Sequence, residues 1–257
     1  MQNDGKYLIP NLQNAIRLVE ELTAHPKGLT LAELIQTLNL PKTTIFRITQ
    51  TLQFHNYVYK DEETNCFFLT RKFMRIGLAA MGEESLIENS LIHMRRLRDD
   101  IHETILLGAL LENQVVLLEQ VMGTHPFTFY LKPGKHFNLH ASAPGKVLMA
   151  FSAEAEKKRL VQSLDMIRFN ERTITSVERM EKELATIKQT GYGLDRAEEL
   201  EGVHCISAPI FNQNGSVLAA IWTTGPSRRL PESDFEMVAK KVKDCALRIS
   251  ATFGYNI

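Results

Sequence analysis

The sequence has few cysteines and no long apolar run. Its three cysteines, Cys66, Cys205 and Cys245, are far apart in 257 residues, so they form neither a disulfide framework nor the paired spacing of a zinc finger. No segment reaches the roughly 20 apolar residues of a membrane span, and the stretch MQNDGKYLIPNL has no signal-peptide core. We therefore expect a cytoplasmic protein in a reducing compartment, with no membrane attachment, cofactor or metal.

Net charge is also absent, because 30 lysines and arginines balance 30 aspartates and glutamates. The charges are not spread evenly. Four of the five charged residues from Lys27 to Lys60 are basic, whereas Glu198, Glu199 and Glu201 form an acidic group far downstream. A locally basic face on a neutral chain favours nucleic-acid contact through one module only. The chain is long enough for two modest domains and has no internal repeat.

The stretch from Thr30 to Arg47, TLAELIQTLNLPKTTIFR, has the pattern of a helix-turn-helix. Thr30 and Glu33 have the spacing of a capping box, in which each side chain satisfies a free backbone N–H at a helix start. Pro41 disfavours helical geometry in the residue before it and suits the start of a new helix, so the turn is short. The first helix has an apolar stripe of Leu31, Leu34, Ile35 and Leu38.

The second helix has the two faces that a recognition helix needs. Its apolar face consists of Ile45, Ile48 and Leu52, and its first turns expose Lys42, Thr43, Thr44 and Arg47. The N-terminal residues of a recognition helix meet base edges and phosphates while the apolar face stays docked. An ordinary helical hairpin with solvated charges has the same pattern, so the motif alone leaves both interpretations open.

Two short strands are predicted directly after this helix, at residues 57–60 (YVYK) and 66–69 (CFFL), joined by the polar tip DEETN. Such a hairpin would form a wing, with Lys60 as its phosphate contact. The acidic tip should stay away from the DNA backbone. The residues expected to contact double-stranded DNA are Thr30, Lys42, Thr43, Thr44, Arg47 and Lys60.

The flanking segments predict a division of the chain into parts. A first amphipathic helix is predicted from its apolar residues Leu12, Ala15, Ile16, Val19 and Leu22. A helix over residues 71–81, with Gly82 as its stop, would link the DNA-binding part to a helix from Ser85 to about His102. We expect a winged helix-turn-helix domain at 1–70, a linker helix at 71–83 and a second domain at 84–257.

The second domain alternates strand pairs with helices. Apolar runs at 104–111 and 114–121 flank a tight turn, runs at 203–211 and 216–223 form a second hairpin, and residues 127–131 could be a further strand before the Pro133-Gly134 turn. Helices are predicted at 144–151, 154–164, 176–190 and 231–252. Strands in hairpin pairs with helices between them imply an α+β fold with an antiparallel sheet, and not a doubly wound parallel one.

Three motifs resemble the IclR family of bacterial transcriptional regulators over essentially the whole chain. They are LPKTTIFRITQTLQFHNYV from Leu40, HASAPGKVLMA from His140, and GYGLD from Gly191 followed by Glu198-Glu199 and GVHCISAPI from Gly202. The resemblance implies a winged helix-turn-helix domain, a linker helix and a GAF-like effector-binding domain. It also implies homodimers, often paired into homotetramers, that bind operator DNA and respond to a small metabolite. Residues 172–176 (RTITS) and GYG look closest to repressors of the 2-keto-3-deoxygluconate type.

A helix that opens at Pro144 would offer free backbone N–H groups of Gly145 and Lys146, which attract carboxylates. The effector-binding residues implied by the family are Ala143, Pro144, Asp195, Val203, Cys205, Trp222 and Thr224, to which we add Gly145 and Lys146. Lys146 either pairs with an effector carboxylate or forms an ion pair with Asp195 or a glutamate. His140 is expected to hold the loop through the backbone, and Glu198 and Glu199 to be solvated or structural. Trp222 either lines the pocket or fills the core.

These patterns predict a DNA-binding transcriptional regulator, and not an enzyme. We expect a repressor of a catabolic operon, controlled by a small carboxylate such as a sugar acid or keto-deoxy sugar acid. The alternatives are an activator or repressor that responds to an aromatic acid or to a keto acid like glyoxylate or pyruvate. An enzyme using Cys205, His140 and Asp195 as nucleophile, base and orienting group would leave the DNA-binding half without a purpose.

Overall fold

The protein, seen in a computed structural model, is described over residues 8–80 and 86–256. It forms two compact units, Met1–Glu84 and Ser85–Ile257. In the described residues, no helix has the length and apolar character needed to cross a membrane. Each unit has its own apolar core, so each is described by itself.

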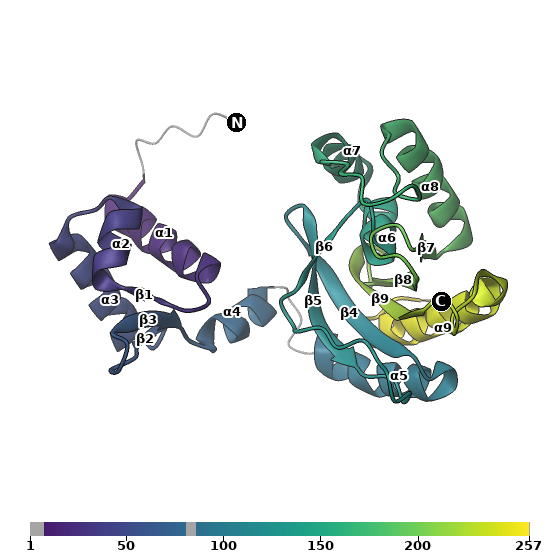
Figure 1. Ribbon diagram of the computed structural model, residues 1–257, viewed down its shortest axis with the longest axis horizontal. Helices are drawn as coiled ribbons and strands as arrows, with labels where there is room; N and C mark the ends of the chain where they lie inside the picture. Colours follow the sequence, from purple (N-terminus) through teal and green to yellow (C-terminus); the bar gives the residue numbers. More distant parts are fainter. Residues whose placement is uncertain (1–7, 81–85, 257) are drawn as a thin grey trace. The chain divides into compact units, whose positions relative to one another are not determined.

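The first unit is a three-helix bundle with a small antiparallel sheet (Figure 1). Its elements are α1 (Pro10–Ala24), β1 (Leu29–Thr30), α2 (Leu31–Leu38), α3 (Lys42–Phe54), β2 (Val58–Lys60), β3 (Cys66–Leu69) and α4 (Lys72–Ala80). The strands are ordered β1-β3-β2, which confirms the predicted wing and adds the short strand β1. The core includes Leu18, Leu34, Ile45 and Phe67.

The apolar face predicted for α1 is partly wrong. Leu12 and Ile16 are 57% and 50% exposed, whereas Leu18 is fully buried. The spacing rule fails here because α1 has two apolar faces, and only the one with Leu18 and Leu22 meets α2, α3 and the wing. The other face is open to solvent in the single chain.

Helix α4 occupies the segment predicted to link the two domains. Its N-terminal end is fixed to the first unit: the Lys72 ammonium donates to the His55 carbonyl at 2.8 Å and lies 4.2 Å from the centre of the Tyr57 ring. The predicted helix stop at Met81-Gly82 and the predicted helix start at Ser85 lie outside the described residues. The next described helix is α5 (Leu86–Ile101).

The second unit is a six-stranded antiparallel sheet with helices on both faces (Figure 1). Its remaining elements are β4 (Thr104–Leu111), β5 (Gln114–Val121), β6 (His136–Asn138), α6 (Ala143–Phe151), α7 (Glu154–Ser163), α8 (Val177–Thr190), β7 (Gly193–Arg196), β8 (Val203–Phe211), β9 (Val217–Pro226), the 3₁₀ turn η2 (Glu232–Asp234) and α9 (Phe235–Thr252). The strand order is β6-β5-β4-β9-β8-β7. Both hairpins and the α+β class are therefore confirmed.

Alternation along the strands gives the sheet two apolar faces. Ile105 and Leu107 of β4 pack with Ile206 of β8 against α5 and α9. Leu106 of β4 and Trp222 of β9 point the other way, into the layer formed by α6, α7 and α8. Because both faces are covered, a polar side chain on either face is buried and needs a partner.

One predicted strand is wrong and two were missed. Residues 127–131 form no strand, because side chains satisfy their backbone: the Gln120 amide donates to the Leu131 carbonyl at 2.5 Å and its oxygen accepts from Leu131 N–H. The edge strand after β5 is β6, which follows the confirmed Pro133-Gly134 turn, where Gly134 has a φ of +87°. Strand β7 was missed because its residues, Gly193 to Arg196, include no β-branched or aromatic side chain.

Candidate nucleic-acid interface and effector site

The start of α2 is built as a capping box. Glu33 N–H donates to the Thr30 hydroxyl at 3.3 Å, and Thr30 N–H donates to the Glu33 carboxylate at 2.8 Å. Hydrogen bonds from Thr30 hold the pKa of the exposed Glu33 carboxyl below its usual value. Asn39, with a φ of 50°, ends α2, and Pro41 precedes α3. These local interactions fix the turn between the two helices.

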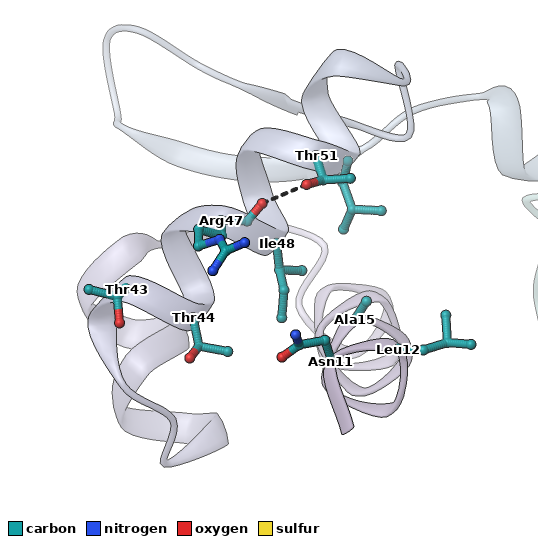
Figure 2. Close-up of a pocket in the computed structure, with 9 residues that line it drawn as sticks. Asn11, Leu12, Ala15, Thr43, Thr44, Arg47, Ile48 and Thr51 are labelled. Carbon is teal, nitrogen blue, oxygen red and sulfur yellow. Dashed lines mark hydrogen bonds between the residues drawn. The ribbon is translucent and has the colours of Figure 1, made fainter. Parts of the chain in front are cut away.

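Helix α3 presents the predicted polar face. Ile45 and Ile48 are buried, while Lys42, Thr43 and Arg47 are exposed. Thr43, Thr44 and Arg47 also line a cavity of about 380 Å³, shared with Asn11, Leu12 and Ala15 of α1 and with Ile48, Thr51 and Leu52 of α3. Figure 2 shows this face, with the Thr51 hydroxyl donating to the Arg47 carbonyl at 2.8 Å.

The wing carries Lys60 at the end of β2, paired in register with Phe67 of β3. Its tip is folded on itself, because the Asp61 carboxylate accepts both the N–H and the hydroxyl of Thr64 at 2.8 and 2.7 Å. These bonds lower the pKa of the Asp61 carboxyl, so the tip stays anionic. Lys60, at the end of β2, is therefore the residue of the wing expected to contact DNA phosphate, and the acidic tip is not.

A row of polar side chains crosses four strands of the second unit. Asp195 of β7 is paired with Cys205 of β8, Cys205 with Thr224 of β9, and Thr224 with Thr104 of β4. The Cys205 thiol donates to the Thr224 hydroxyl at 3.3 Å. The row includes three predicted effector residues, and Val203 lies two residues before Cys205 on the same face. Sequence reasoning missed Thr104, which enters the row only through the sheet topology.

Burial changes the proton affinity of this row. Asp195 is 7% exposed, and its pKa is raised to about 7, first by burial and also by the nearby Glu198 carboxylate. Burial likewise raises the pKa of the Cys205 thiol well above its usual value. Cys205 is therefore a neutral thiol and a poor nucleophile.

The N–H groups predicted to be free at the start of α6 are already used, which corrects the prediction. Helix α6 begins at Ala143 with Ser142 as its cap: Gly145 N–H donates to the Ser142 hydroxyl at 3.2 Å, and Lys146 N–H to the Ser142 carbonyl at 3.1 Å. Gly145 is required because a Cβ there would lie 2.5 Å from the Leu139 backbone. Ala143, Pro144 and Gly145 are all buried beside the site.

Lys146 lies at the centre of a buried ion cluster. Its ammonium is fully buried and donates to Glu198 at 2.5 Å and to Glu183 at 3.3 Å. The structure shows the ion pair of Lys146 with a glutamate, and pairing with an effector carboxylate stays a prediction. Glu198 was expected to be solvated or structural. It is buried, and it has a structural role because it binds the Lys146 ammonium. A lone lysine within the apolar helix APGKVLMAF was the signal for a buried counter-ion.

Trp222 is 2% exposed and packs edge-on against Phe137, with ring centres 5.5 Å apart. Gly108 of β4 makes room for the indole, since a Cβ at this position would lie 3.0 Å from two indole carbons. Cys205 packs against the same apolar cluster. The indole is therefore one wall of the layer into which the polar row points.

The segment between β5 and β6 lies beside the end of the polar row. The Thr104 hydroxyl donates to the Phe129 carbonyl at 3.2 Å, and Arg229 donates to the Phe127 carbonyl at 3.2 Å. Arg229 is itself held by the 3%-exposed Glu103 carboxylate. Two side chains thus fix this segment against the sheet.

The alternative enzyme site is not assembled in the described chain. His140 bonds the Ile167 carbonyl at 2.9 Å and stacks on Phe169, as expected for a histidine that holds a loop. Asp195 and Cys205 are neighbours, but their partners are Glu198 N–H and Thr224. Among the described residues, no group of three or more His, Cys, Asp or Glu side chains could hold a metal ion.

Comparison with known proteins covers both units. Residues 11–62 match the IclR helix-turn-helix domain, and residues 78–251 match the bacterial transcriptional regulator IclR C-terminal domain. The chain belongs to the IclR family. It is 33% identical to the HTH-type transcriptional regulator KdgR of Escherichia coli over 226 residues, which cover 88% of this chain and 86% of that protein. It is therefore a DNA-binding transcriptional regulator, as are its relatives.

Two further similarities extend this assignment. The chain is 28% identical to the HTH-type transcriptional repressor AllR of Escherichia coli, over 95% of this chain and 90% of that protein. The solved C-terminal domain of E. coli KdgR aligns with a TM-score of 0.60 at 34% identity, covering 66% of this chain and 99% of the domain. IclR-family membership thus holds for both units.

Proposed function

We propose that the protein is a repressor of a catabolic operon, and that it contacts its operator through Lys42, Thr43, Thr44 and Arg47, flanked by Thr30 and Lys60. The observation that carries this proposal is the exposed polar start of α3 on a docked apolar face. The wing supplies Lys60 beside it. The similarity to AllR, a repressor, and to KdgR supports repression over activation.

The effector in this proposal is a small carboxylate, a sugar acid or keto-deoxy sugar acid, that binds at Asp195, Cys205 and Thr224. Buried carboxylate and hydroxyl groups in a row suit a ligand with several hydroxyl groups. The proposal also assigns Ala143, Pro144, Gly145, Lys146, Val203 and Trp222 to this site. Because the N–H groups of Gly145 and Lys146 are occupied, the ligand carboxylate needs other donors.

Regulation in this proposal acts through the spacing of two DNA-reading units in a homodimer or a dimer of dimers. Paired recognition helices must enter major grooves about 34 Å apart, so a small rotation can misalign them. The effector would reorder the loops beside α6 and β7, and the helix in segment 71–83 would pass the change to the DNA-binding units.

Operator binding tests the DNA-reading face. The substitution Lys42→Ala should weaken binding to the operator and lower the slope of log K against log salt by about 1, because one phosphate contact is lost. Fluorescence anisotropy over a salt series measures both values. Lys158→Ala, at an exposed lysine of α7, removes the same charge outside the interface and should change neither. If Lys42→Ala leaves affinity and slope unchanged, Lys42 is not in the interface.

Thermal stability tests the effector class. A ligand that binds only the folded state raises stability by RT ln(1 + [L]/Kd), about 2.7 kcal/mol at a hundredfold excess over Kd. A shift with one sugar acid, followed by operator release with the same compound, supports the proposal. A shift only with an aromatic acid or a glyoxylate-like acid would replace the proposed effector class.

A further inference from the structure

Three buried side-chain atoms in the described part of the second unit, called the effector-binding unit below after its proposed role, have no hydrogen-bond partner: Ser90 Oγ, His93 Nδ1 and Glu198 Oε2. Ser90 and His93 belong to α5, whereas Glu198 adjoins the polar row through its bond to Asp195. Glu198 is 4% exposed, and its Oε1 accepts from the Lys146 ammonium at 2.5 Å. Its Oε2 is buried and accepts no hydrogen bond within the described part of the chain. A buried carboxylate oxygen without a donor is destabilising, and such orphaned atoms are rare in folded proteins. This oxygen therefore calls for a donor from outside the chain.

The surroundings of Glu198 connect it to the polar row. Glu198 N–H donates to the Asp195 carboxylate at 2.8 Å, and the Glu198 charge acts on both Asp195 and Cys205. The backbone at Glu198 is also held, because the Thr173 hydroxyl donates to the Glu198 carbonyl at 2.7 Å. The carboxylate is thus fixed beside the site instead of being free to turn toward water.

The charge balance of the cluster disfavours binding of the effector carboxylate at this end of the site. One ammonium, Lys146, is shared by two carboxylates, Glu198 and Glu183, so the cluster already carries more negative than positive charge. An added anion would meet buried negative charge, whereas a neutral hydroxyl would supply the missing donor without adding charge.

We propose that Glu198 Oε2 accepts a hydrogen bond from a hydroxyl group of the effector, so that Glu198 selects polyhydroxylated acids and directs the ligand carboxylate away from the Lys146 cluster. This inference rests on the proposed effector site. Glu198 then has two roles, since one oxygen holds Lys146 and the other reads the ligand.

The substitution Glu198→Gln separates these two roles. The Lys146 ammonium requires an oxygen, so the Gln carbonyl takes the position of Oε1 and the amide NH₂ takes the position of Oε2. The bond to Lys146 is kept, while the atom that faces the ligand changes from an acceptor to a donor. Glu183→Gln is the matched control, because it removes the same charge from the same lysine and leaves Glu198 intact.

Calorimetric Kd values for matched pairs of acids provide the readout. The pairs are 2-keto-3-deoxygluconate with 2-oxohexanoate, and gluconate with hexanoate, which differ in their hydroxyl groups at equal chain length. The wild-type protein should prefer a hydroxylated acid, and Glu198→Gln should reduce that preference about fivefold to tenfold, because the amide NH₂ can still donate to the ligand hydroxyl but without a charge to strengthen the bond. Glu183→Gln should keep the preference within about threefold, because no ligand bond is lost.

Equal loss of affinity for both members of a pair in Glu198→Gln would overturn the inference, since Glu198 would then be structural only. Lack of preference in the wild-type protein would overturn it while leaving effector binding in place. No binding of any of the four acids would instead overturn the proposed effector class, and the inference with it. If Glu198→Gln does not fold, Lys146→Met with Glu198→Met removes both buried partners together, a change that proteins often tolerate, and must show the same loss of preference.

Discussion

The substitution Asp195→Asn should stabilise the ligand-free protein above neutral pH. Burial raises the pKa of Asp195 from 3.8 to about 7. The folded state therefore holds a proton that the unfolded state releases between pH 4 and 7, and the free energy of unfolding falls as pH rises through that window. A shift of about three pKa units corresponds to about 4 kcal/mol. Asparagine does not titrate, and its side-chain oxygen can still accept the Glu198 N–H.

Urea denaturation at pH 4 and pH 8, followed by tryptophan fluorescence, measures this effect. Trp222 is the only tryptophan and lies in β9, so its signal reports the effector-binding unit alone. The difference in unfolding free energy between the variant and the wild-type protein should approach about 4 kcal/mol at pH 8 and shrink toward pH 4. The exposed Asp165 provides the control, because Asp165→Asn should shift stability by less than about 0.5 kcal/mol. A variant no more stable than wild type at pH 8 would refute the reasoning.

Two further substitutions test the packing of each unit. Thr30→Ala removes the cap of α2 and should destabilise the DNA-binding unit by about 1 kcal/mol. An unchanged thermal melt, followed by helical circular dichroism, would show that the capping box does not stabilise this unit. Gly108→Ala places a Cβ 2.7 Å from the Val116 carbonyl and 3.0 Å from the indole of Trp222. It should destabilise the effector-binding unit by about 1–3 kcal/mol and shift the Trp222 emission, whereas a neutral effect would mean that the indole moves freely.

Local rules were enough to predict the helix-turn-helix from sequence. Thr30, Glu33 and Pro41 act on neighbours within a few residues, so their spacing alone gives the ends of α2 and α3. The same rules gave a partly wrong result for α1. Its exposed apolar face has the same helical spacing of apolar residues as a buried face. Exposure of Leu12 depends on which elements pack around α1, and sequence periodicity does not contain that information.

The effector-binding unit depends on contacts between distant residues. The sequence left Lys146 to pair either with an effector carboxylate or with Asp195 or a glutamate, and it could not name the glutamates, because Glu198 and Glu183 lie 52 and 37 residues away. Thr104 meets Thr224 only because β4 and β9 are neighbours in the sheet. The strand expected at 127–131 was wrong for the same reason, since the partner of Leu131 is the side chain of Gln120 and not a strand.

The buried polar groups between the sheet and the layer of α6, α7 and α8 lower the stability of the effector-binding unit. Apolar side chains of similar volume would remove the burial penalty of Asp195 and the unsatisfied oxygen of Glu198, and replacing a buried ion pair in this way is often neutral or stabilising. Natural proteins keep such destabilising groups mainly where function needs them. A ligand hydroxyl that bonds Glu198 would remove one of these penalties only while it is bound, so ligand affinity and the stability of the loop from Asp195 to Gly202 are linked. In the proposed function, that linkage would allow occupancy of the site to change the structure around α6 and β7 and so to control the DNA-binding units.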